Sequence, residues 1–239
     1  MATSRYLALE LASTIRHDGN GGVADELTSV GGLTSWVAAH EELLAAEGFA
    51  AAGTGAAATA AGSAARFDVD VDVDMDADVD MDADVDVRFD VDEASWTQVL
   101  AVRAALRALL ARAVSPAPPS RADADRLPPA DQALARLNTV AAHCPVVPRL
   151  HWPADTEPVA RLHPASPSSS TALPAALARA AIAFLSSPDL PRLRACTAPR
   201  CVRYFLKEHG RQEFCKASCS NRARAARHYQ RHHAAPAAD

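Results

Sequence analysis

Four of the five cysteines lie in two short runs, Cys196-Thr197-Ala198-Pro199-Arg200-Cys201 and Cys215-Lys216-Ala217-Ser218-Cys219, in a chain of 239 residues. Thirteen residues separate the two runs. Two pairs of closely spaced thiols let two tight turns place four sulfurs around one tetrahedral ion. Four protein ligands leave no open position for water or substrate. We therefore expect one structural zinc ion, bound by Cys196, Cys201, Cys215 and Cys219.

Other interpretations of the cysteines stay open at this point. Thiolates also bind iron, although the usual iron–sulfur runs have other spacings. The cysteines could be free or form two disulfides, but their clustering is more typical of a metal site than of a secreted disulfide framework. A histidine could replace one thiolate, and the nearby candidates are His209, His228, His232 and His233.

The residues after Cys219 predict a basic helix. Ser220 or Asn221 can cap it, and the residues that follow are rich in Ala and Arg, which are strong helix formers. Helical spacing turns Ala223, Ala226 and Tyr229 towards the cysteines and leaves a basic face on the other side. Arginine binds phosphates and reads guanine edges. The residues expected to contact DNA are Arg222, Arg224, Arg227 and Arg231. A solvated helix is the alternative.

The charge of the chain is strongly segregated. Residues 67–93 contain twelve Asp, one Glu and one Arg, for a net charge of −12, whereas residues 191–233 carry +9. The acidic block alternates Asp with apolar residues, and we interpret it as a solvated linker because a row of carboxylates on one strand face repels itself. An edge strand, a segment ordered by a partner and a divalent-cation site are the alternatives. On its tether, the acidic block can compete with DNA for the basic block.

The rest of the chain favours helices. Leu33, Trp36 and Leu44 predict one core-facing helix, and Trp96 to Leu110 predict a longer one. A shorter helix is expected with Pro128 and Pro129 in its first turn and Leu134, Leu137 and Ala141 inward, and another from about Leu173 to Leu185. Two short extended runs between residues 146 and 162 can pair as a hairpin.

We therefore expect a mainly α fold: a helical N-terminal domain, with a short β-hairpin as an option, and a small four-cysteine module that ends in a basic helix. The expected organisation, in chain order, is a first part of the helical domain at 1–49, a disordered Ala/Gly-rich and then Asp-rich insertion at 50–93, a second part at 94–190, the zinc module at 191–233 and a disordered tail at 234–239.

The cysteine module resembles the CGNR zinc finger family, which is named for a Cys-Gly-Asn-Arg run at the last metal-binding cysteine. Here the run is Cys219-Ser220-Asn221-Arg222. The serine is a departure, because a turn that needs a positive φ at that position would be strained. Phe214 also stands where tryptophan is common, which keeps an aromatic ring beside Cys215.

The N-terminal part resembles the ABATE domain, a stress-induced transcription regulator region that usually precedes this finger. The resemblance rests on residues 7–16, on Asp25-Glu26-Leu27, on the Leu33 to Trp36 helix and on Leu137-Asn138. It implies a helical domain in a DNA-binding regulator.

Our expected function is a transcriptional regulator whose helical domain dimerises or senses a small-molecule effector. Thr14 and Arg16 precede a Gly-rich turn and could line a cavity for a small anionic effector, but an exposed arginine at a helix end is the more common explanation of Arg16. The alternative is an adaptor whose basic finger binds an acidic protein. We expect no enzyme, because the sequence has no phosphate loop or nucleophile motif. Glu10 interrupts the early apolar stretch and no membrane-spanning run appears, so we expect a cytoplasmic protein.

Overall fold

The computed structural model describes residues 6–18, 20, 22–47, 91–123, 127–152, 154–165 and 170–233. These residues form seven α-helices, two short 3-10 helices and three two-stranded antiparallel sheets. Helices build the packed body, but the strands are more numerous than the single hairpin that the sequence predicted. The expected tail and most of the expected insertion lie outside the described residues, so the disorder predicted for them stays a prediction.

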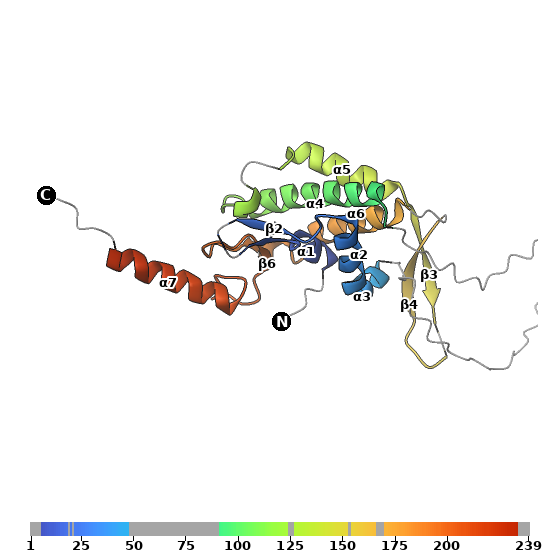
Figure 1. The fold of residues 1–239 in the computed structure, drawn as a ribbon. Helices are drawn as coiled ribbons and strands as arrows, with labels where there is room; N and C mark the ends of the chain where they lie inside the picture. Colours follow the sequence, from blue (N-terminus) through green and yellow to red (C-terminus); the bar gives the residue numbers. More distant parts are fainter. Residues whose placement is uncertain are drawn as a thin grey trace, which may run out of the picture.

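The central helix is α4 (Glu93–Val114), which packs against α5 (Ala130–Ala142), α6 (Ala172–Leu185) and α1 (Leu7–Ala12) (Figure 1). It begins with a capping box: the Asp92 carboxylate accepts the Ser95 backbone N–H at 2.7 Å, and Ser95 Oγ accepts the Asp92 N–H at 2.9 Å. The predicted apolar face is confirmed, since Val99, Val102 and Leu106 are fully buried.

The predicted inner face of α5 is wrong in detail. Its buried residues are Ala133, Leu137 and Val140, whereas Leu134 is 50% exposed. α5 begins at Ala130, directly after Pro129. Ala133 and Leu137 are four residues apart and therefore lie on the same side of the helix, which is the side that faces α4 and α6.

The helix predicted from Leu33 to Leu44 is two helices, α2 (Val30–Ala39) and α3 (Glu41–Ala46). The break is at His40, whose φ of −123° and ψ of 23° are not helical. The His40 ring stacks on Trp36, and its Nδ1 lies 2.7 Å from the Trp36 carbonyl oxygen, which stabilises the break. The predicted core residues are nevertheless buried on both sides of it.

The expected hairpin is confirmed as β3 (Val146–His151) and β4 (Val159–Pro164), which project from the body (Figure 1). Near the N-terminus, β1 (Ile15–His17) pairs with β2 (Val23–Asp25). The third pair, β5 (Leu193–Ala195) with β6 (Tyr204–Leu206), opens the cysteine module. Two 3-10 helices, η1 (Arg121–Asp123) and η2 (Leu190–Arg192), fill loops. Among the described residues, no helix is both long and apolar enough to cross a bilayer.

Candidate metal centre and basic helix

The four clustered cysteines come from the β5–β6 hairpin and from the start of the last helix. Cys196 follows β5 and Cys201 precedes β6, while Cys215 and Cys219 flank the start of α7 (Ala217–His233). In the hairpin turn, the Cys201 N–H donates to the Ala198 carbonyl at 3.0 Å. Arg200 has a φ of 63°, a left-handed conformation that is uncommon outside glycine and helps this turn to close.

The sulfur positions fit one tetrahedral ion. All four Sγ atoms lie within 4.8 Å of one another, and Sγ of Cys215 is 3.7 Å from that of Cys201 and 3.5 Å from that of Cys219. A tetrahedron with zinc–sulfur bonds of about 2.3 Å has sulfurs roughly 3.8 Å apart. Cys196, Cys201 and Cys219 are buried in a small cluster with Phe205.

Three of the four thiols change one another's pKa values. The hydrogen bond from Cys196 lowers the pKa of Cys201. The same contact raises the pKa of Cys196, and hydrogen bonds to Cys196 and Cys201 raise that of Cys215. One negative charge therefore suppresses ionisation of its neighbours, whereas a divalent cation stabilises all of the thiolates together.

The first half of the module is anchored in the helical body. Arg107 of α4 is 1% exposed and donates to both carboxylate oxygens of Asp123, at 2.7 and 3.0 Å. Tyr204 of β6 donates to Asp123 Oδ2 at 2.7 Å, and burial together with that carboxylate raises the Tyr204 pKa strongly. Arg107 also donates to the carbonyl of Val202, the residue after Cys201. The first cysteine pair is thus fixed to the body.

The helix α7 begins earlier than predicted. It starts at Ala217, so Ser220 and Asn221 lie inside it and do not cap it. Among the non-glycine residues that the structure describes, Arg200 alone has a positive φ. The strain considered for Ser220 is therefore wrong, because that position is helical. Cys219 in the first turn also receives the favourable field of the helix N-terminus.

Three of the four arginines predicted to contact DNA share one exposed face. Arg224, Arg227 and Arg231, with Gln230, line a groove of about 560 Å³ on α7. The helix contains no acidic residue and projects away from the body (Figure 1). Arg231 lies seven positions after Arg224 in the helix, which spaces them about 10 Å apart along the axis.

Arg222 is placed differently from the other three. Its side chain is half-buried, with Nη1 3.0 Å from Nε2 of His17 in β1 and Nη2 3.6 Å from the Cys219 sulfur. It therefore joins a metal ligand to the N-terminal sheet. On the far side of α7, Ala223 is buried as predicted, but Tyr229 is 63% exposed, so its predicted packing on the module is wrong.

Thr14 and Arg16, predicted to line an effector pocket, have different surroundings. Thr14 is fully buried, donates to the Leu11 carbonyl at 2.8 Å and accepts from Arg103 at 2.9 Å. Arg16 is half exposed and forms an ion pair with Glu26. The structure does not bring the two side chains to a common partner among the contacts it describes.

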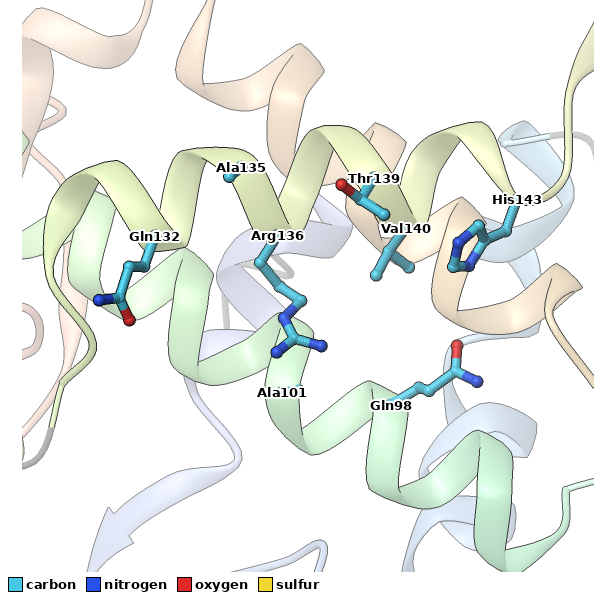
Figure 2. A pocket seen from close by; sticks show the side chains of 8 residues that line it. All are labelled: Gln98, Ala101, Gln132, Ala135, Arg136, Thr139, Val140 and His143. Carbon is cyan, nitrogen blue, oxygen red and sulfur yellow. The ribbon is translucent and has the colours of Figure 1, made fainter.

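A groove between α4 and α5, which sequence reasoning missed, also has a volume of about 560 Å³. Figure 2 shows Gln98 rising from α4 towards His143, and Arg136 reaching from α5 towards α4. Oε1 of Gln98 is buried without a hydrogen-bond partner among the described residues. No sequence motif marks the groove, because helix packing brings its residues together from two separate helices.

Comparison with known protein families confirms the resemblance stated for each part of the chain. A family model, ABATE, described as "Putative stress-induced transcription regulator", matches residues 6–188. A model of the CGNR zinc finger matches residues 192–232. No curated protein matches the chain. The finger match and the four clustered cysteines fit one structural zinc ion, as their spacing predicted.

Proposed function

Because the chain belongs to the ABATE family and ends in a CGNR zinc finger, we propose that it is a transcriptional regulator that binds DNA through α7. One observation carries this proposal: Arg224, Arg227 and Arg231 form an exposed cationic face on a helix whose first turn contains a metal ligand. The zinc-bound turn holds the helix in place, and the arginines supply the charge that phosphates attract.

The proposed role of the metal is structural. When bound, zinc links the two cysteine pairs and so fixes the start of α7 against β5 and β6. Cys196, Cys201, Cys215 and Cys219 would fill its four coordination positions, which leaves none for a substrate. We therefore propose no enzymatic activity for the chain, and a cytoplasmic location belongs to the same proposal.

Arg222 is left out of the proposed DNA face. Its guanidinium already contacts His17 and the Cys219 sulfur, so its charge serves the metal centre and its contact with the body. This makes Arg222 a useful comparison for the exposed arginines, since the four residues share a helix and a side chain but differ in burial.

The test is an electrophoretic mobility assay with random duplex DNA at several salt concentrations. Phosphate contacts predict a steep loss of affinity with salt, and Arg224→Ala, Arg227→Ala or Arg231→Ala should each lower the magnitude of the slope by about one. An arginine that reads guanine would instead relax preference at one base, at roughly 1–3 kcal/mol. Arg222→Ala should leave the salt slope unchanged and weaken zinc retention.

A cationic face also suits an acidic protein, so an adaptor is the second candidate. The charge of +9 in residues 191–233 favours it as much as it favours DNA. If full-length, zinc-loaded protein binds no duplex even at low salt, the regulator proposal fails and the adaptor takes its place.

The helical body would supply the sensing or dimerising part of this regulator. We place a small-molecule effector in the groove between α4 and α5 rather than beside Thr14, because Thr14 is fully buried. There the Arg136 guanidinium offers a donor to a polar ligand, and the Gln98 oxygen, which has no hydrogen-bond partner in the described part of the chain, offers an acceptor.

A further inference from the structure

The hairpin β3–β4 has two chemically different faces. Residues that pair directly across an antiparallel sheet lie on the same face, and successive residues alternate between faces. The pairs Val146–Pro164, Pro148–Leu162 and Leu150–Ala160 therefore make one wholly apolar face. The other three pairs make a basic face, and they are Val147–His163, Arg149–Arg161 and His151–Val159.

The apolar face is not covered by the described part of the protein. Leu150 is 70% exposed, and Trp152, which continues the same alternation, is 65% exposed. A two-stranded hairpin is marginally stable in water, and a third strand or a packed partner is what usually stabilises it. The hairpin thus exposes more apolar area than is usual for a loop surrounded only by water.

The basic face defines the charge of the partner. Arg149 lies directly opposite Arg161, and like charges at directly paired positions repel. A second copy of the hairpin, aligned on the same faces, would add two more arginines to this row. The carboxylates of an acidic strand would relieve this repulsion. The other side of such a strand has to be apolar, so that it continues the apolar face of the hairpin.

The chain itself contains a segment with that pattern. Residues 68–86 alternate ten Asp with nine Val, Met or Ala without a break. We propose that the β3–β4 hairpin binds residues 68–86 of the same chain as an added strand, with its carboxylates on the basic face and its apolar side chains extending the apolar face. This strand addition uses backbone hydrogen bonds for affinity and alternate side chains for specificity.

The connection between the segment and α4 is short. Five residues link Asp86 to Asp92, the cap of α4, and they reach up to about 17 Å when extended. The second turn of α4 lies near the start of β3, because Gln98 shares its groove with His143, three residues before Val146 (Figure 2).

The outer edge of β4 suits an added strand better than that of β3. Proline cannot donate to a sheet, and β3 has Pro148 in its middle, whereas the proline of β4 is its last residue, Pro164. An incoming strand can therefore pair along the greater part of β4. The inference is independent of the proposed DNA binding.

Hydrogen exchange of the full-length, zinc-loaded protein tests the inference. Peptides from residues 68–86 should exchange about tenfold more slowly in the native chain than in an Arg149→Glu/Arg161→Glu variant, because the variant reverses the charge of the docking face. An Arg112→Glu/Arg211→Glu variant, with the same charge change at two exposed arginines elsewhere, should keep the native protection. Equal exchange in the native chain and the Arg149/Arg161 variant would overturn the proposal.

Fluorescence provides a second measurement that does not depend on the segment's own amides. The contribution of Trp152, isolated by comparison with Trp152→Phe, should shift to longer wavelength when residues 67–90 are deleted, because its apolar surroundings are lost. An unchanged Trp152 spectrum would contradict docking on this face. Protection that rises with protein concentration would also overturn the intramolecular form, because it would mean that the segment docks on another copy.

Discussion

The two halves of the zinc finger are stabilised in different ways. In the first half, Leu193 and Tyr204 belong to the main hydrophobic core, and Tyr204 shares a buried network with Arg107 and Asp123. In the second half, α7 is exposed along most of its length, and its described contacts with the body include the one between Arg222 and His17. The body therefore fixes the positions of Cys196 and Cys201, whereas the metal has to fix the positions of Cys215 and Cys219.

The half of the finger that the core stabilises is therefore not the half that carries the proposed function. The half that is anchored in the core does not contain the arginines of the proposed DNA face, and the half that contains them depends on four sulfurs for its position. At 17 residues, α7 is only slightly longer than the roughly 12–15 residues below which isolated helices are marginal in water, so its stability depends strongly on tertiary contacts. Zinc loss should thus disorder α7 and leave the body folded.

The largest effect is expected from breaking the metal site. Cys215→Ser should abolish stoichiometric zinc, and with it a metal-binding free energy on the order of 10 kcal/mol. Elemental analysis measures the metal, and hydrogen exchange measures α7 and the β5–β6 pair separately. Cys144→Ser, at a buried cysteine outside the cluster, should keep one zinc per chain. Equal loss of protection in β5, β6 and α7 would contradict the difference between the halves.

The next largest effect should come from the body. Arg107→Ala leaves the buried Asp123 carboxylate without its cationic partner, with the Tyr204 hydroxyl still donating to it, and removal of one member of a buried ion pair costs about 3–5 kcal/mol. Urea unfolding should show a loss of this size. Arg112→Ala, at an exposed position near the end of the same helix, should change the unfolding free energy by less than about 0.5 kcal/mol. If the two variants are alike, the network does not anchor the finger.

These anchors mark the limit of what the sequence could predict. The cysteine site follows from short spacings, and the face of α4 from its apolar period, because both are local patterns. Arg107 was missed because arginine on a helix is usually exposed, and nothing in the sequence shows that Asp123 is buried beside it. The same holds for Arg103, whose partner Asp25 is 78 residues away.

The basic helix was also predicted only in part. The period of α7 places Arg224, Arg227 and Arg231 together, but it cannot show that Arg222 turns to His17, which is 205 residues away in the chain. Likewise, the break at His40 depends on a side-chain contact with Trp36 that periodicity does not encode. Tertiary contacts decided each of these positions.

A smaller effect, on the pH dependence of the unfolding free energy, is expected from the β1–β2 sheet, whose His17 contacts α7. Burial alone would raise the pKa of Asp25, but the Arg103 side chain and the Leu27 N–H outweigh it and lower the pKa below the ordinary value of 3.8. The stability from this pair is therefore present above the unfolded-state pKa and is lost as pH falls through the folded-state pKa. Acid titration of unfolding should show a loss of about 1 kcal/mol or less, because the Asp25 side chain is 33% exposed. Asp25→Asn should remove this part of the pH dependence.

The smallest effect concerns competition between the two basic surfaces for the acidic segment. On charge alone, residues 67–92 should occupy α7, and their deletion should tighten DNA binding at low salt. Docking on the hairpin changes that expectation, because a segment held by β4 is withdrawn from α7. Deletion of residues 67–90, which keeps the Asp92 cap, should then raise DNA affinity by less than about threefold. It should hardly move the melting temperature, because so acidic a segment adds little to the apolar core.

The decisive comparison combines that deletion with the hairpin variant. Arg149→Glu/Arg161→Glu should weaken DNA binding in the full chain, because the released segment now competes for Arg224, Arg227 and Arg231 at a high effective concentration. The same variant should have no effect in the chain that lacks residues 67–90. Mobility shifts at low salt measure all four combinations. If deletion alone tightens binding strongly, the segment occupies α7 and the hairpin inference fails. If all four bind alike, the segment competes for neither surface and α7 is governed by its metal site alone.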